Sequence, residues 1–316
     1  MSEQSLFVSS SLKFGGPPSS DFATFIILLD AITAAVAPLR LTHSYTLTTS
    51  GSVGRGTPLP DTKQIHSKLY RRTTETLALL SQHPDKPVQR DAYASVDLER
   101  SAASNVEKNV NRPLERVSFN RTLPSSETRQ YITALQRVFS LLNAPSGYVH
   151  ATSEWTCAVS ETGFVGVSPT RPEPPSRPDG TRDPDVARAW LMWKHEEDTN
   201  ERVRAVADVR AQVGPRLRGT YWGTFLGREM VDELGGAVRV RREAPVHLVE
   251  SFGDGALYLQ LTPEPAPITT PAMQTGLLAL EQFLLPVLVP LPPYWATRAA
   301  KAAQRAAERG GTTTSA

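Results

Sequence analysis

The sequence predicts an α+β fold, with a mostly antiparallel sheet, or two related sheets, flanked by amphipathic helices. Three observations favour this class. Short segments of alternating apolar and polar residues indicate strands, segments with apolar residues three or four apart indicate helices, and the two kinds do not alternate regularly. The turn Gly253-Asp254-Gly255 between two apolar segments predicts a hairpin, since such turns need positive backbone angles.

The predicted strands begin and end at turn residues. Gly15-Gly16 ends the first strand and Pro124 ends the fourth, because glycine and proline interrupt a regular strand. The segments predicted as strands are, in order, 6–14, 41–47, 93–98, 114–123, 237–241, 246–252 and 256–261.

The predicted helices are bounded by capping residues and prolines. Ser20 or Asp21 can cap the first helix and Pro38 ends it, while Ser125 or Ser126 can cap the helix with the clearest apolar stripe. The segments predicted as helices are 22–36, 65–80, 125–142, 184–213, 228–234 and 273–285.

Strand, helix and strand follow one another twice, at residues 5–48 and 114–167, which suggests two similar β-α-β halves. We predict a single α+β domain over residues 1–297, with the proline-rich segment 171–184 as a loop inside it. A basic, alanine-rich tail over residues 298–316 follows the domain.

Composition limits the class of protein. The net charge of +2 over 316 residues does not indicate a polyelectrolyte partner. The single cysteine, Cys157, excludes an internal disulfide and suits a reducing compartment. The N-terminus lacks a secretion signal, and the apolar run 25–37 is too short and too polar to span a bilayer. We therefore expect a soluble, cytoplasmic protein without a membrane partner.

The sequence contains no recognisable motif for catalysis or metal binding. The six histidines are scattered, and there is no zinc helix, phosphate loop or nucleophile elbow. His43 lies on the buried face of a predicted strand and is interpreted as a core histidine. We expect no enzyme activity, no metal and no cofactor, although catalytic groups that converge from distant positions stay possible.

The segment Arg218–Gly227 carries glycines at every fourth position, 219, 223 and 227, with aromatic and leucine side chains between them. Glycine allows close backbone approaches, so this segment is interpreted as a loop that leads into the helix 228–234 and forms core contacts. Gly235-Gly236 stands where a left-handed helix cap is expected.

Five residues of this region carry a family resemblance: Trp222, Leu226 and the ending Leu234-Gly235-Gly236. They resemble the signature of a bacterial family of type VI secretion system immunity proteins, which are associated with effectors that bear a VRR-type nuclease domain. The segment from Phe283 to Trp295 resembles the closing segment of that family. The resemblance covers nearly the whole chain and implies that the five signature residues are structural.

The resemblance implies a protein that binds and neutralises a cognate antibacterial toxin, a nuclease, by occluding its catalytic domain. Two acidic regions are candidate contacts on grounds of exposure and charge: Asp254 at the hairpin tip, and the helix that carries Glu196, Glu197, Asp198 and Glu201. Beside His195, this second cluster can also be a solvated helix face. The oligomeric state is left open.

Two alternatives remain. The stripe Arg298, Lys301, Arg305 and Arg309 can contact phosphates, which would fit a nucleic-acid-binding accessory protein. Few aromatic residues accompany it, so no nucleic acid partner is expected. The second alternative is a hydrolase whose polar groups converge in a pocket.

Overall fold

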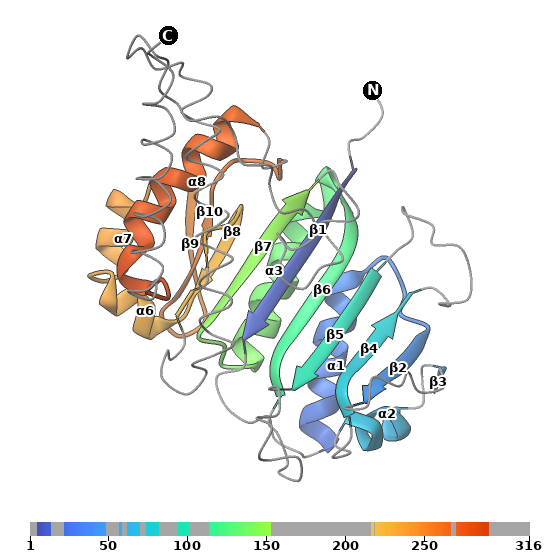
Figure 1. The fold of residues 1–316 in the computed structure, drawn as a ribbon. Coiled ribbons are helices and arrows are strands. Elements are labelled where there is room, and N and C mark those ends of the chain that lie inside the picture. Colours follow the sequence, from blue (N-terminus) through green and yellow to red (C-terminus); the bar gives the residue numbers. More distant parts are fainter. Residues whose placement is uncertain are drawn as a thin grey trace, which may run out of the picture.

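The computed structural model describes residues 5–13, 22–48, 57–58, 62–69, 74–81, 94–100, 114–152, 216–217, 219–266 and 270–290. Ten strands in these ranges form one sheet in the order β3-β2-β4-β5-β6-β1-β7-β8-β10-β9, and every neighbouring pair is antiparallel (Figure 1). The strands are β1 (Ser5–Lys13), β2 (His43–Thr48), β3 (Thr57–Pro58), β4 (Thr74–Leu80), β5 (Ala94–Arg100), β6 (Leu114–Pro124), β7 (Ser146–Thr152), β8 (Gly223–Leu226), β9 (Leu248–Phe252) and β10 (Ala256–Gln260).

Helices cover this sheet, so the predicted α+β class with an antiparallel sheet is confirmed. The helices are α1 (Phe22–Val36), α2 (Thr62–Leu69), α3 (Thr128–Leu141), α6 (Arg228–Glu233), α7 (Ala237–Glu243) and α8 (Pro271–Leu284), with the 3₁₀ turns η2 (Ser125–Glu127) and η3 (Leu285–Val287). Helices α1 and α3 lie together on one face, and α6, α7 and α8 gather at the β8–β10 end (Figure 1). None of the helices described here has the length and apolar character to cross a membrane.

The sheet face under α1 and α3 is apolar because alternate residues of each strand point to it. In β1 and β6 these include Leu12, Val117 and Phe119, which are fully buried. The antiparallel register continues the apolar face across the sheet. Further fully buried members are Val8, Leu77, Leu79, Val96, Leu98 and Val149.

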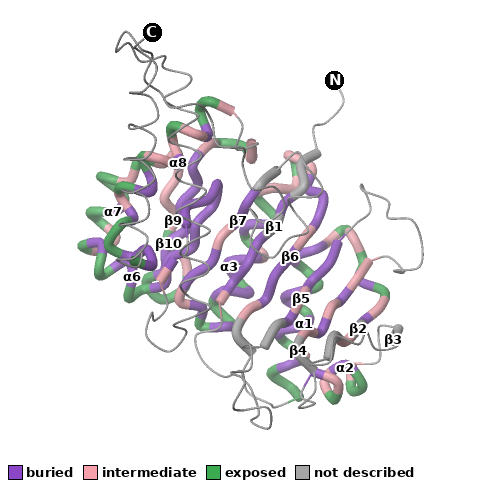
Figure 2. Tube along the Cα trace, viewed as in Figure 1, coloured by how far each residue is buried: buried purple, intermediate pink, exposed green. Residues whose placement is uncertain are grey.

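Strands β8 and β10 are buried on both faces, whereas the edge strand β9 is half-buried. All residues of β8 and of β10 are buried (Figure 2), which explains why their sequences lack the apolar–polar alternation of a half-exposed strand. Phe225 and Tyr258 pack on the α3 side, with ring centroids 4.8 Å apart. Their neighbours Leu226 and Leu257 point to the opposite face and are buried there too.

Two predicted elements were wrong in type. Residues 237–241, predicted as a strand, form the helix α7, because Gly236 at φ 90° turns the chain and α7 follows directly. Its valines have no ladder partner, and Val238 is 76% exposed. Residues 65–80, predicted as one helix, divide into α2 and the strand β4. In β4, Leu77 and Leu79 share a buried face, a period of two that the helical spacing concealed.

The glycine-rich segment and the start of α3 also need correction. β8 is a strand, where a loop was predicted. Neither Ser125 nor Ser126 caps α3, because both lie in η2, and Glu127 takes the N-cap position without a side-chain hydrogen bond. The expected hairpin is confirmed by β9 and β10.

Four sequence features lie outside the described residues: the predicted helix 184–213, the proline-rich segment 171–184, Cys157 and the tail 298–316.

The two strand–helix–strand units, β1-α1-β2 and β6-α3-β7, occupy different positions in the sheet. Strands β4, β5 and β6 separate β1 from β2, whereas β1 alone separates β6 from β7. The first strand of the first unit is therefore inserted into the second unit. Because of this insertion the two units share one sheet and cannot separate without breaking both β1 ladders.

One charged side chain lies on the apolar face at the centre of this arrangement. Arg121 of β6 is 1% exposed and donates hydrogen bonds to the carbonyl oxygens of Ala35 and Ala37, at 3.4 and 2.9 Å. It pairs with Glu127 of η2, and its guanidinium carbon lies 5.6 Å from the ring centre of Tyr131. The side chain thus joins the C-terminal end of α1, β6, η2 and α3.

We expect Arg121→Met to lower the free energy of unfolding by about 3 kcal/mol, because it leaves carbonyl groups and a carboxylate without their donor. Urea denaturation followed by circular dichroism measures this change. The matched control is Arg129→Met, which removes an ion pair to Glu250 from a 65% exposed side chain. Its expected cost is below about 1 kcal/mol. Equal losses in both variants would contradict the role given to Arg121.

Candidate partner-binding groove

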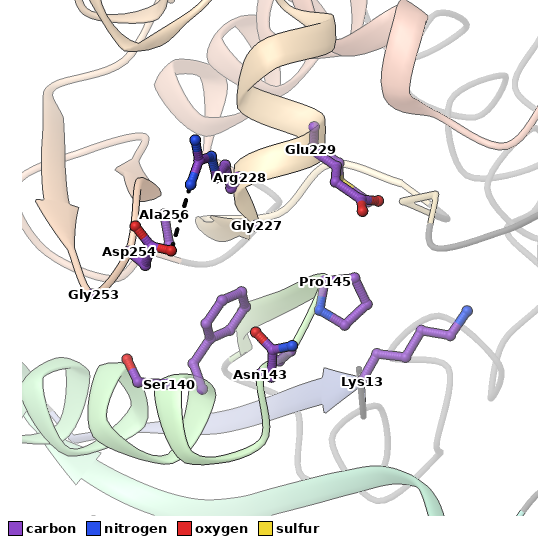
Figure 3. Close-up of a pocket in the computed structure, with 13 residues that line it drawn as sticks. Lys13, Ser140, Asn143, Pro145, Gly227, Arg228, Glu229, Gly253, Asp254 and Ala256 are labelled. Carbon is purple, nitrogen blue, oxygen red and sulfur yellow. Dashed lines mark hydrogen bonds and ion pairs between the residues drawn. The ribbon is translucent and has the colours of Figure 1, made fainter. Parts of the chain in front are cut away.

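A groove opens at the end of the sheet where β1, β8 and the β9–β10 hairpin finish (Figure 3). Its volume is about 680 Å³. We call it the end groove and define it by its lining residues: Lys13, Phe139, Ser140, Asn143, Ala144, Pro145, Gly227, Arg228, Glu229, Met230, Gly253, Asp254 and Ala256. One wall is the C-terminal end of α3 and the turn into β7, and the other is the start of α6 with the hairpin tip (Figure 3).

The two walls are fixed to each other by backbone contacts. The amide of Gly227 donates a hydrogen bond to the carbonyl oxygen of Pro145 at 2.9 Å. A Cβ atom at Gly227 would lie 2.7 Å from that oxygen, so only glycine fits without a shift. On the other side of the groove, a Cβ at Gly253 would lie 3.0 Å from Ser140 Oγ. The opening is therefore preformed.

The floor of the groove is apolar. Phe139, Ala144, Met230 and Ala256 line it and are buried. The Phe139 ring is stacked on Phe225 at 5.5 Å, and edge-on to Phe252 at 5.3 Å, which holds the ring in place.

The rim carries charges of both signs. Asp254 stands on the hairpin tip between Gly253 and Gly255, whose φ angles are 52° and 76°, and its side chain is 95% exposed. Arg228 lies 3.5 Å from Asp254 (Figure 3). It lies 3.9 Å from Asp232, and both distances are at the long end for ion pairs. Such exposed pairs are weak, so both partners remain available to another molecule.

The sign of charge changes between the two short helices. Helix α6 carries Glu229, Asp232 and Glu233 against Arg228. Helix α7 carries three arginines against Glu243, whose pKa is lowered by hydrogen bonds from Arg239 and Arg242. The wall of the end groove formed by α6 and the hairpin tip is thus the acidic side of this region.

The structure places the residues predicted from sequence in different surroundings. Asp254 lies on the groove rim, while Glu196, Glu197, Asp198 and Glu201 lie outside the described residues. Trp222, Leu226 and Leu234 are buried, and the Trp222 indole donates to Thr262 Oγ1 at 3.0 Å. Gly235 and Gly236 adopt φ angles of 92° and 90° after α6.

Sequence reasoning did not find the rest of the groove. Lys13, Asn143 and Pro145 come from the ends of elements that are distant in sequence and meet through strand pairing, which no local pattern reveals. Arg228 and Glu229 stand directly after Gly227. The four-residue glycine spacing that ends at Gly227 was the available signal, because it marked a close backbone approach.

The sheet face opposite α1 and α3 is polar near β1. Ser118 donates to Ser11 Oγ at 3.4 Å, and both side chains are buried. His150 of β7 lies on this face, 5% exposed, with its ring 6.3 Å from that of Tyr221. Burial lowers the pKa of His150 to about 4. His43, expected in the core, is half-buried and contacts Thr42 Oγ1 at 2.9 Å.

Metal-ligating side chains do not converge in this part of the molecule. No group of three or more histidine, cysteine, aspartate or glutamate side chains among the described residues is arranged to hold a metal ion. The end groove itself contains two carboxylates, a lysine and an arginine, and no histidine. Charged side chains around an apolar floor are an arrangement suited to binding.

We expect Gly227→Ala to lower the free energy of unfolding by about 1–3 kcal/mol, because the added methyl group overlaps the Pro145 carbonyl. The backbone itself does not cause the loss, since φ at Gly227 is −71° and suits any residue. Gly236→Ala is the comparison: its φ is 90° but nothing lies within 4 Å of the new Cβ. Amide chemical shifts of residues 143–146 should change in the first variant alone.

The buried histidine makes stability depend on pH. His150 stays neutral in the folded state down to about pH 4, whereas in the unfolded chain it takes up a proton below about pH 6.5. Stability is therefore lost as pH falls through this window. Between pH 7 and pH 5 we expect a contribution of about 2 kcal/mol, by linkage. Urea midpoints measured at the two pH values should show this loss of stability in the native chain and not in His150→Gln. The control is His247→Gln, which changes an exposed histidine and should keep the loss.

Comparison with known proteins identifies a shared fold. No family model matches the sequence, and no curated protein matches it. Among solved structures, the Pseudomonas aeruginosa T6SS protein PA0821 is similar with a TM-score of 0.56 and 13% sequence identity. The similarity covers 90% of this chain and 73% of that protein. The chain therefore shares its overall fold with a type VI secretion system (T6SS) protein.

Proposed function

We propose that this chain is an immunity protein that binds and neutralises a cognate antibacterial toxin of a type VI secretion system. The toxin is a nuclease, and the immunity protein occludes its catalytic domain without catalysing a reaction. The observation that carries the proposal is the fold shared with a T6SS protein over 90% of the chain. The sequence resemblance to T6SS immunity proteins, centred on Trp222 and the Leu234-Gly235-Gly236 ending, supports the same assignment.

The described surface offers a suitable contact region. The end groove has fixed walls, an apolar floor and an exposed charged rim, the combination that protein interfaces use for their central contacts. Asp254 stands at its most exposed point. A nuclease must bind a polyanion, so the surface around its catalytic site is basic, and an acidic hairpin tip is complementary to it.

The mechanism that follows is steric and electrostatic occlusion. The α6–hairpin wall would occupy the basic entrance to the toxin's catalytic site, and the rest of the interface would exclude nucleic acid from it. Acidic residues on this wall favour a protein partner over nucleic acid, because phosphates would be repelled by Glu229 and Asp254. The end groove therefore supports toxin binding, while the basic stripe 298–309, on which the nucleic-acid alternative depends, lies outside the described residues.

The test is co-expression with the product of the neighbouring gene in a sensitive host, followed by purification of the pair. Rescue of growth together with a stable complex is the expected result. Toxicity without rescue, or separate elution of the two proteins, would refute the immunity role.

Asp254→Lys is expected to weaken the complex about 10-fold, equivalent to about 1.4 kcal/mol, because it replaces a rim carboxylate by a cation facing a basic surface. Asp30→Lys on the exposed side of α1 makes the same charge change away from the end groove and is the matched control. Calorimetric titration of the purified pair measures both. Equal affinities of the two variants would place the interface elsewhere on the molecule.

A further inference from the structure

The end groove combines two features that a flat charged surface lacks. Its floor is buried and apolar, with Phe139, Met230 and Ala256 beneath the opening, while every charged lining residue stands on the rim. None of its lining residues has a buried side-chain nitrogen or oxygen without a hydrogen bond, so an apolar group on the floor leaves no such side-chain atom unpaired. The chemistry fits an apolar side chain.

The groove is also rigid before any partner arrives. The Gly227–Pro145 hydrogen bond joins the two walls. At the other end of the groove the Gly253 backbone lies so near α3 that an added Cβ would be 3.0 Å from Ser140 Oγ. The Phe139 ring is held by Phe225 and Phe252. A preformed site binds with little reorganisation, which is the property of the pockets that hold the central anchor residues of protein interfaces.

The rim selects the charge beside that anchor. The guanidinium of Arg228 has two exposed carboxylates near it, of Asp254 at 3.5 Å and Asp232 at 3.9 Å. Glu229 lines the same wall and points away from Arg228, and Lys13 stands on the opposite wall (Figure 3). The long Arg228–Asp254 contact leaves Asp254 able to accept a shorter bond from another cation. An occupant with a positive charge next to its apolar group is therefore favoured over a neutral or an anionic one.

We infer that the end groove is an anchor pocket, which takes an aromatic side chain from a basic loop of a protein partner. The aromatic group lies on the Phe139 floor, and a neighbouring lysine or arginine of the loop pairs with Asp254 or Glu229. The identity of that partner as the toxin rests on the proposed function. The existence of the pocket does not depend on the proposed function, because its specificity can be measured with small probes.

The probes are three tryptophan derivatives of nearly the same shape: tryptophanamide, a cation; N-acetyltryptophanamide, neutral; and N-acetyltryptophan, an anion. Saturation-transfer NMR on the full chain is expected to show binding in that order of affinity. The cation should exceed the neutral probe by roughly 3-fold, the range of one exposed ion pair. Asp254→Lys should reverse the order of the cation and the anion.

Ser140→Trp tests the location of the site. Ser140 lies on the surface of α3, lines the groove and donates to the Gln136 carbonyl at 3.0 Å, so a tryptophan there fills the opening without removing a core residue. Thr133→Trp is the matched control, since Thr133 is also exposed on α3 and donates to the carbonyl four residues earlier, at 3.0 Å. Probe binding is expected to fall at least 5-fold in the first variant and to stay unchanged in the second.

Three results would overturn the inference. They are no probe binding at about 10 mM, well above the roughly 1 mM dissociation constant that about 0.3 kcal/mol per non-hydrogen atom gives for such a probe; binding with no preference for the cation; or equal binding by both tryptophan variants. Measurements of toxin binding and of growth rescue distinguish this inference from the proposed function. Loss of toxin binding in Ser140→Trp alone supports both. Probe binding without growth rescue retains the pocket and refutes the immunity role, whereas rescue that is unaffected by Ser140→Trp retains the role and refutes the pocket as the toxin's anchor site.

Discussion

The insertion of β1 between β6 and β7 is the constraint on which the rest of the structure depends. It brings two strand–helix–strand units into one sheet and places α1 beside α3 on one face. Arg121 lies where these elements meet, and its hydrogen bonds to the end of α1 and to Glu127 satisfy polar groups that the insertion buries. Tyr131 continues this connection to β1 through its hydrogen bond to Ser10 Oγ at 2.8 Å, and burial raises its pKa to about 12.

The end groove follows from the same sheet. Its walls are the end of α3 with the turn into β7, and the start of α6 with the hairpin tip. Phe139, Phe225 and Tyr258 pack α3 against β8 and β10 beneath them. The hairpin is tied to α3 at its other end, where Arg129 hydrogen-bonds Glu250 and lowers the pKa of that carboxyl. A rigid scaffold thus carries a short exposed tip. Residues on the rim of the end groove can be substituted in this arrangement without changing the packing of its floor.

Local patterns in the sequence were sufficient for α1, α3 and the hairpin, because each carries both a clear period and a boundary residue such as Pro38 or Gly253. They failed for α7, where alternating Val238 and Val240 imitate a strand, and for β4, where leucines at 77 and 80 imitate a helix turn. Asp254 could be proposed as a contact residue because the Gly253-Asp254-Gly255 turn is visible in the sequence. The rest of the groove could not, because it depends on the long-range pairing of β7 with β8. The buried position of Arg121 could not be predicted either, because it is a charged residue on the apolar face of a strand.

Strand pairing between β7 and β8 closes a long stretch of chain, since the described structure passes from Thr152 to Arg216 across residues 153–215. The entropic cost of closing a loop rises only with the logarithm of its length, about 0.6 kcal/mol for each doubling. On this term alone, a change of a few residues in the length of chain between β7 and β8 alters the free energy of pairing the two strands by well under about 0.6 kcal/mol.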